Sequence, residues 1–405
     1  MNQLGKPKHS IVLLVDGLRP SSLGPYGNTW YDTNCFNQLA SQSLLFEKCI
    51  ADTTDLQLGI RSLLSTQHAL APWEDANLLV ERLDQLAVEF QIVSSDRSKY
   101  ESLESLRDSI VFVDLQPPTE LARDISSSLM GQFFGVAIEV IKDLEKPTCL
   151  ILDCPGFGEF WDAPYSFRES LADDEDPEPS DKVAAPSLQF NESTDDPDLL
   201  FEFQVAYGGQ VEMLDRLLGV LFEAVGSKIW QQSLFCLTST RGFPLGEHGV
   251  VGYYRPVLNA ESIHVPLLIR WPETSFSGRS QCLVHPTSLG SALLHWHGYR
   301  ENLPLTVPGI DRDNWIPNET NSGLVCSVAE QPFCAIQTCH WKYVSGPHPA
   351  LYVKPDDIWE FNDVLELCPS IASQLSDALE FGKNELNNGR VPKFEFGEEV
   401  AFGVE

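Results

Sequence analysis

Positively charged residues are scarce in this sequence. Its 405 residues contain 27 Lys and Arg against 58 Asp and Glu, which gives a net charge of −31 at pH 7. Nucleic acids and anionic membrane surfaces repel such a chain, so we expect neither as a partner. The remainder is typical of a globular protein, because 43% of the residues are hydrophobic and the length suits one large domain, alone or with a small one.

Long apolar runs and closely paired cysteines are also missing. The first apolar run, Ile11–Val15, is too short for the core of a signal peptide and far too short to span a bilayer. No two of the 10 cysteines form a CxxC pair, so a zinc ribbon is not expected. Most of them should be small core residues in a reducing compartment. We therefore expect a cytoplasmic protein.

Strand-like and helix-like patterns alternate along most of the chain. Apolar runs of strand length include Ser10–Val15, Thr148–Cys154 and residues 265–271, whereas residues 205–225 carry apolar side chains at helical spacing. Such alternation is typical of a mostly parallel sheet with helices on both faces. We therefore predict an α/β domain over residues 1–318.

Two regions depart from this alternation. Residues 171–200 hold ten acidic residues and four prolines, so we expect an exposed, flexible insertion that buries too little apolar surface to fold tightly. Residues 319–405 contain strand patterns typical of an antiparallel sheet and an amphipathic helical pattern at 368–382. This part is predicted to form a small C-terminal α+β subdomain.

Five stretches of the sequence, taken in order, resemble landmarks of the sulfatase family, which belongs to the alkaline phosphatase superfamily. They are IVLLVDGLRPSSLGPYGN, RSLLST, YGGQVEMLDRLLGVL, TSTRGFPLGEHG and LYVKPDDIWEFNDV. In the family the first is a strand that ends in paired aspartates and the turn after it, and the second begins the helix that carries the nucleophile. The resemblance covers nearly the whole chain apart from residues 171–200, and it implies an alkaline-phosphatase-like fold.

The same resemblance implies a specific catalytic apparatus. A working sulfatase carries a formylglycine made from Cys or Ser, a Ca²⁺ held by acidic and amide ligands, and Lys and His groups around the sulfate. The hydrated aldehyde supplies the nucleophile, and the cation stabilises charge on the sulfuryl oxygens. Because Ca²⁺ takes about six to eight oxygen ligands, a cluster of carboxylates is needed.

The metal-ligand positions are mostly lost when they are matched one by one. Asp16 corresponds to the first ligand, whereas Gly17, Thr240 and Arg241 occupy the other three positions and are not suited to hold a cation. A carboxylate at a partly buried strand end is costly without a positive partner, and a guanidinium can neutralise it. We therefore predict an ion pair between Asp16 and Arg241, and expect no cofactor; Ca²⁺ is implied only if the family activity survives.

The attacking group and the sulfate contacts are missing as well. The nucleophile position falls on Leu56 in an ungapped match, and on Gln57 if Arg61 is kept as the arginine of the helix. Neither Leu nor Gln can become formylglycine. Tyr253 stands where the family has a lysine, and Lys99 is a candidate remnant of another sulfate-contacting lysine. No residue is thus assigned a catalytic role.

The remaining charged residues near these motifs have two interpretations each. Arg241, Arg61 and Arg19 are candidates for binding an anion. Arg19 could equally be structural, and Arg241 could serve only as the partner of Asp16. His248 lies in a GEHG motif that we expect to order a loop.

Three functions remain open from the sequence. The first is a sulfatase-family protein that has lost sulfuric-ester hydrolysis, a pseudoenzyme retained for binding or scaffolding. The second is a sulfuric-ester or phosphoric-ester hydrolase with an atypical site, and the third is a metal-free anion-binding module. The partner would be a sulfated or other anionic small molecule or carbohydrate, or a protein.

Overall fold

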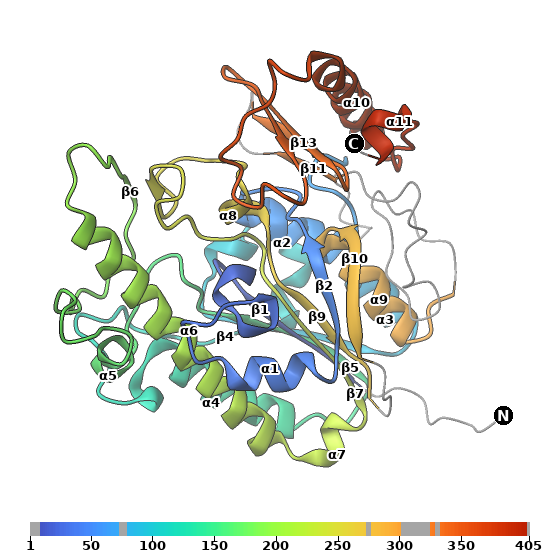
Figure 1. The fold of residues 1–405 in the computed structure, drawn as a ribbon. Coiled ribbons are helices and arrows are strands. Elements are labelled where there is room, and N and C mark those ends of the chain that lie inside the picture. The colour runs from blue at the N-terminus through green and yellow to red at the C-terminus, as the bar shows by residue number, and fades with distance from the viewer. Residues whose placement is uncertain (1–8, 73–78, 273–276, 301–324, 329–332, 403–405) are drawn as a thin grey trace. The chain divides into compact units, whose positions relative to one another are not determined.

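The computed structural model describes residues 9–72, 79–272, 277–300, 325–328 and 333–402 (Figure 1). The chain divides into two compact units. The first comprises Met1–Leu45, Ala87–Arg255 and Pro266–Gly278, and the second comprises Phe46–Leu86, Pro256–Val265 and Arg279–Glu405. The predicted domain boundary after residue 318 lies outside the described residues.

Eight strands form the main sheet, and most of their pairings are parallel. β1 pairs in parallel with β5 and β7, and β3 pairs in parallel with β5 and β4, whereas β9 is antiparallel to β7. Across the sheet the order is β10 (Gly278–Val284), β2 (Leu44–Cys49), β9 (Leu267–Arg270), β7 (Ser233–Thr238), β1 (His9–Val15), β5 (Thr148–Cys154), β3 (Glu89–Ser94) and β4 (Ile110–Phe112).

The central strands of this sheet are buried along their whole length. Every residue of β1, β5 and β7 is buried, which explains their continuous apolar sequences, because a strand covered on both faces has no polar side. The prediction of an α/β fold with a mostly parallel sheet is confirmed.

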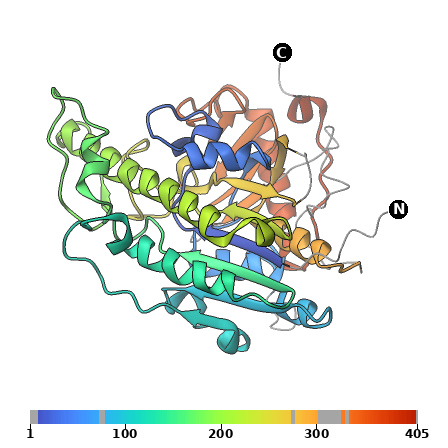
Figure 2. The ribbon, with the colours of Figure 1, turned by 90° about the horizontal axis from the view of Figure 1, so that it is seen from below.

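Three helices of the first unit pack against one another. Helix α6 (Pro197–Val225) contacts α1 (Asn34–Ala40) and α4 (Leu129–Lys142), and Figure 2 looks onto this helical layer. Helix α6 begins where the Asp196 side chain accepts a hydrogen bond from the Asp198 amide, and it ends at Gly226, whose φ is +78°. Among the described residues, no helix is long and apolar enough to cross a lipid bilayer.

The acidic segment 171–200 is only partly a surface loop. Its residues 173–176 are exposed. By contrast, Leu188–Gln189 form strand β6, which pairs with β8 (Val250–Val251), and the side chain of Phe190 is buried. The last four residues of the segment begin α6. The other short helices of the first unit are α5 (Tyr165–Glu169) and α7 (Ser227–Trp230).

The second unit contains the predicted antiparallel sheet and C-terminal helix. The strands pair in chain order, and α10 packs on them through a shared apolar core. The C-terminal tail docks on this same subdomain, because the Trp341 indole donates to the Glu399 carbonyl at 3.1 Å and Val400 is buried. The elements of this unit are α2 (Leu56–Ser65), α3 (Leu79–Asp84), α8 (Ala260–Ile263), α9 (Leu289–Trp296), β11 (Val325–Val328), β12 (Cys334–Gln337), β13 (Trp341–Ser345), β14 (Ala350–Val353), α10 (Pro369–Asn387) and α11 (Glu398–Phe402).

Candidate functional site

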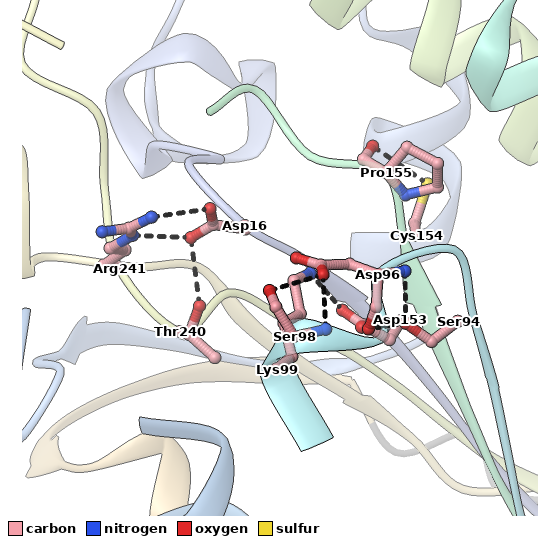
Figure 3. A network of polar contacts seen from close by, with 10 residues as sticks. All are labelled: Asp16, Ser94, Asp96, Ser98, Lys99, Asp153, Cys154, Pro155, Thr240 and Arg241. Carbon is pink, nitrogen blue, oxygen red and sulfur yellow. Dashed lines mark hydrogen bonds and ion pairs between the residues drawn. The ribbon is translucent and has the colours of Figure 1, made fainter. Parts of the chain in front are cut away.

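Two neighbouring strands of the first unit bring the predicted site residues together. Asp16 directly follows β1, while Thr240 and Arg241 follow β7, the parallel neighbour of β1. The carboxyl ends of parallel strands lie at one edge of a sheet, where ligands of open α/β folds usually bind. Figure 3 shows the three side chains converging at this edge.

Asp16 and Arg241 form a two-point ion pair. The Arg241 Nε lies 2.9 Å from Asp16 Oδ1, and its Nη2 lies 3.1 Å from Asp16 Oδ2. The Thr240 hydroxyl donates a further hydrogen bond to Asp16 Oδ1 at 3.2 Å. Asp16 is only 5% exposed, so both carboxylate oxygens are taken up by protein donors in a nearly dry environment. The predicted ion pair is present.

This pair keeps the buried carboxylate ionised. Burial by itself would raise the pKa of Asp16, because a charge is less stable away from water. The charge and hydrogen bonds of Arg241, together with Lys99 and Thr240, outweigh that effect and hold the pKa of Asp16 below its usual value. The site thus contains a fixed negative charge that a fixed positive side chain has already neutralised.

The ring of Tyr253 packs against the guanidinium of Arg241. The Arg241 Cζ lies 3.5 Å from the centre of the Tyr253 ring, which is a cation–π contact. The Tyr253 hydroxyl donates to the Gly242 carbonyl at 3.1 Å, and this bond fixes the ring in place. Sequence reasoning noted Tyr253 only as a lost lysine and missed this role. A ring next to a loop arginine has no spacing signal that would have shown the contact.

The backbone conformation of Gly17 and its contact with Tyr253 both favour glycine at this position. Its φ is +81°, a left-handed conformation that side chains other than hydrogen disfavour. A Cβ atom at this position would lie 2.9 Å from the Tyr253 hydroxyl oxygen and 3.0 Å from the Phe157 Cβ. A second carboxylate therefore cannot be placed at position 17 while Tyr253 keeps its position.

A second buried ion pair lies beside the first. The Lys99 Nζ lies 2.9 Å from Asp153 Oδ1, and the Ser94 hydroxyl donates to Asp153 Oδ2 at 2.7 Å (Figure 3). Burial by itself would lower the pKa of Lys99, but the carboxylates of Asp153 and Asp16 raise it above its usual value. Lys99 is thus a charge partner of Asp153. Sequence reasoning missed Asp153, whose only signal is one acidic residue near the end of an apolar run.

The side chains at this edge do not fit the Ca²⁺ that the family resemblance implies. Both oxygens of Asp16 already accept hydrogen bonds, Arg241 carries a positive charge where a ligand would be, and Gly17 offers no side chain. Within the residues that the structure describes, no group of three or more His, Cys, Asp or Glu side chains could hold a metal ion. A hard cation needs several oxygen ligands, whereas the carboxylates described here, Asp16 and Asp153, are each already paired with a positive side chain.

Arg19 is engaged in the loops that follow β1 and β7. Its Nη2 forms an ion pair with Glu247, its Nη1 donates to the Phe243 carbonyl at 3.3 Å, and its Nε donates to the Ser21 hydroxyl at 3.0 Å. Arg19 is 5% exposed. The carboxylate of Glu247 comes from the GEHG motif, so that motif orders its loop through a buried ion pair.

The remaining candidate residues belong to the second unit. Leu56 is the first residue of α2, and Gln57 follows it. The helix is capped by Asp55, whose side chain accepts a hydrogen bond from the Leu58 amide at 2.8 Å. The Nη2 of Arg61 donates to the Ala69 carbonyl at 3.0 Å. An apolar side chain and an amide thus occupy the two alternative nucleophile positions at the start of this helix.

Comparisons with known proteins agree on the fold. Residues 137–299 match the family model described as sulfatase, whereas no curated protein matches the sequence. The phosphonate monoester hydrolase of Agrobacterium radiobacter is 13% identical with a TM-score of 0.73, over 94% of this chain and 96% of that chain. A protein solved with its substrate D-glucosamine-2-N,6-O-disulfate is 14% identical with a TM-score of 0.74, over 94% and 98% of the two chains. A 2-O GAG sulfatase is 14% identical with a TM-score of 0.69, over 98% and 96%.

Proposed function

We propose that this chain is a pseudoenzyme of the sulfatase family, a proposal supported by the match of residues 137–299 to the sulfatase family model and by the shared fold. In this proposal it has lost sulfuric-ester hydrolysis and keeps the fold for binding or scaffolding. A protein side chain has taken the place of the cation, and no group able to attack a sulfur atom stands at the start of α2.

One observation carries the proposal, namely the two-point pairing of Arg241 with Asp16. A sulfatase metal site needs a carboxylate whose oxygens are available to a cation, and here both oxygens face a guanidinium at 2.9 and 3.1 Å. Tyr253 and Gly17 reinforce the pairing, since the ring covers Arg241 and the glycine leaves no room for another ligand. These contacts of Tyr253 and Gly17 support the proposal that the metal site has been lost.

The two other functions are less well supported. A hydrolase with an atypical site would need a nucleophile and a means of stabilising the charge that develops in the transition state. An anion-binding module would need uncompensated positive charge. At this edge Arg241 is paired with Asp16, Lys99 with Asp153 and Arg19 with Glu247. These three positive groups thus already have carboxylate partners, which weakens their attraction for a further anion.

Turnover by the purified full chain tests the proposal. The substrates are 4-methylumbelliferyl sulfate and the corresponding phosphate and phenylphosphonate esters, each with added Ca²⁺ or Mn²⁺, and Asp16→Asn is the matched control variant. We expect the wild-type rate to equal that of the variant and of the buffer. A metal-dependent rate that the Asp16→Asn variant abolishes would overturn the proposal and favour the atypical hydrolase.

A further inference from the structure

A surface cavity of 640 Å³ lies in the first unit, and none of its lining residues takes part in the site described above. Its volume is within the range of roughly 300 to 1,000 Å³ that is typical of small-molecule sites. One wall is formed by residues 119–121 and the other by residues 181–184 of the acidic segment. Tyr165, the first residue of α5, completes the lining.

Both walls are fixed to the same stretch of chain. The Ala122 amide donates to the Asp162 carbonyl at 2.9 Å, and the Trp161 amide donates to the Val183 carbonyl at 2.7 Å. The Ala185 amide donates to the Glu159 carbonyl at 2.8 Å. Residues 159–162 therefore hold the two walls at a set separation. A cavity that is formed in advance in this way loses little conformational entropy when a ligand binds.

A buried arginine ties the acidic segment down beside the cavity. Arg168, in α5, is fully buried, and its two terminal nitrogens donate to the carbonyls of Ser180 and Trp161. Burying a guanidinium is costly, and the nearby carboxylates of Asp181 and Asp162 offset part of that cost. Through these two hydrogen bonds Arg168 links the acidic segment, at Ser180, to the stretch that carries Trp161.

The chemistry of the lining favours a positive ligand with an apolar body. Leu121 and Val183 supply apolar surface, and Tyr165 supplies an aromatic ring. Glu120 and Asp181 supply two carboxylates against the single ammonium of Lys182. The guanidinium of Arg168 also interacts with Asp181, and the carboxylates of Glu178 and Glu169 oppose its effect at Tyr165.

Most of the charged groups that act on the Tyr165 hydroxyl are carboxylates. Burial and the nearby carboxylates of Glu178 and Glu169 raise its pKa, against the opposing effect of Arg168. Negative charge thus dominates at the ring, which repels a sulfate group and attracts a cation.

We propose that this cavity binds a small organic ammonium ion with an alkyl body. The ammonium group would lie between Glu120 and Asp181, and the alkyl chain would contact Leu121, Val183 and the ring of Tyr165. The site depends on neither the loss of hydrolysis nor the Asp16–Arg241 pair. It gives the acidic segment a role beyond keeping the protein soluble.

Calorimetric titration of the full chain with hexylammonium, hexanol and hexanoate tests the proposal, because these three probes share one alkyl body and differ in charge. We expect saturable binding of hexylammonium, at least tenfold weaker binding of hexanol, and no binding of hexanoate. Absence of saturable hexylammonium binding, or equal binding of all three probes, would overturn the proposal.

Variants test whether binding depends on the cavity residues or only on the overall negative charge of the chain. The double variant Glu120→Gln, Asp181→Asn is expected to weaken hexylammonium binding by about fivefold for each charge removed, the effect of one unit charge at about 4 Å in water. Lys182→Met should strengthen binding by a similar factor. The control, Asp173→Asn with Glu175→Gln, removes two exposed carboxylates outside the lining and should change affinity less than twofold. Weakening by the control equal to that of the cavity variant, or weakening by Lys182→Met, would contradict the proposal.

Discussion

Replacing Arg241 by Met should destabilise the first unit strongly. The change keeps an apolar stem of similar length but removes the positive charge that faces Asp16 at 2.9 Å. Asp16, which is 5% exposed, would then be a buried carboxylate with only the Thr240 hydroxyl as its direct partner and Lys99 as a nearby charge.

The size of the effect follows from the burial of the pair. Breaking a buried ion pair by removing one partner typically costs about 3 to 5 kcal/mol, since the other charge remains buried and uncompensated. Thr240 and Lys99 still favour the carboxylate, so the lower part of this range applies. Loss of the stacking on Tyr253 adds about 1 kcal/mol, which gives a total of about 4 kcal/mol.

The assay is urea denaturation followed by tryptophan fluorescence, with two controls. Arg241→Lys keeps the charge but loses the two-point geometry and should cost about 1 to 2 kcal/mol. Arg216→Met breaks the exposed pair with Asp32, whose side chains are 53% and 45% exposed, and should cost less than about 1 kcal/mol. The double variant Asp16→Leu, Arg241→Met should be more stable than Arg241→Met, because no charge is left buried.

The pH dependence of the free energy of unfolding provides a second test, because its expected direction is known. In the wild type the pKa of Asp16 is lowered, so its contribution is present above the pKa of the unfolded chain, about 3.9, and is lost as the pH falls through the folded pKa. Without Arg241 burial should raise the folded pKa, so the deficit of Arg241→Met should shrink as the pH is lowered from 7 toward 5. A deficit below about 1 kcal/mol at pH 7, or one that grows on acidification over this range, would refute the reasoning.

Three further predictions concern other parts of the chain. Gly17→Ala should lower the melting temperature more than Gly27→Ala. Both glycines have positive φ, but only a Cβ at Gly17 would clash with a neighbour, the Tyr253 hydroxyl. Equal losses of melting temperature would contradict this clash. Lys342→Met should lower the free energy of unfolding in urea by about 3 kcal/mol, because Lys342 is fully buried and its Nζ lies 2.7 Å from a Glu360 carboxylate oxygen. The control Lys383→Met, which breaks a more exposed pair, should cost under about 1 kcal/mol. Similar losses in the two variants would contradict the prediction for Lys342. Burial lowers the pKa of His264 and His285 to about 4, below the unfolded value of about 6.5, so the stability that each contributes at pH 7 is lost as the pH falls from 6.5 toward 4. His285→Gln should therefore flatten the acid dependence of the urea midpoint, and an unchanged slope would exclude His285 as its source.

The sheet could be predicted from the sequence because its central strands have a simple signature. β1, β5 and β7 are buried on both faces. Strands buried in this way have continuous apolar runs, such as TCLILDC, which can be recognised in the sequence. The acidic segment was harder to interpret. Its composition predicts exposure, but its position depends on Arg168 and on pairing with β8, contacts that composition does not reveal.

The site was partly predictable for a related reason. The Asp16–Arg241 pair followed from the family resemblance, which matched both residues to metal-ligand positions, and the structure shows that they follow neighbouring strands. Tyr253 and Asp153 were missed in their roles. Tyr253 reaches Arg241 from a separate loop, and Asp153 finds Lys99 across the sheet edge, so neither contact leaves a spacing pattern in the sequence.

The metal content of the native full chain tests the central claim most directly. Plasma mass spectrometry after dialysis against Ca²⁺-containing buffer, with the Asp16→Asn variant alongside, measures whether any cation competes with the guanidinium for Asp16. We predict no stoichiometric divalent metal in the wild type. About one Ca²⁺ per chain, lost in an Asp16→Asn variant, would contradict the account.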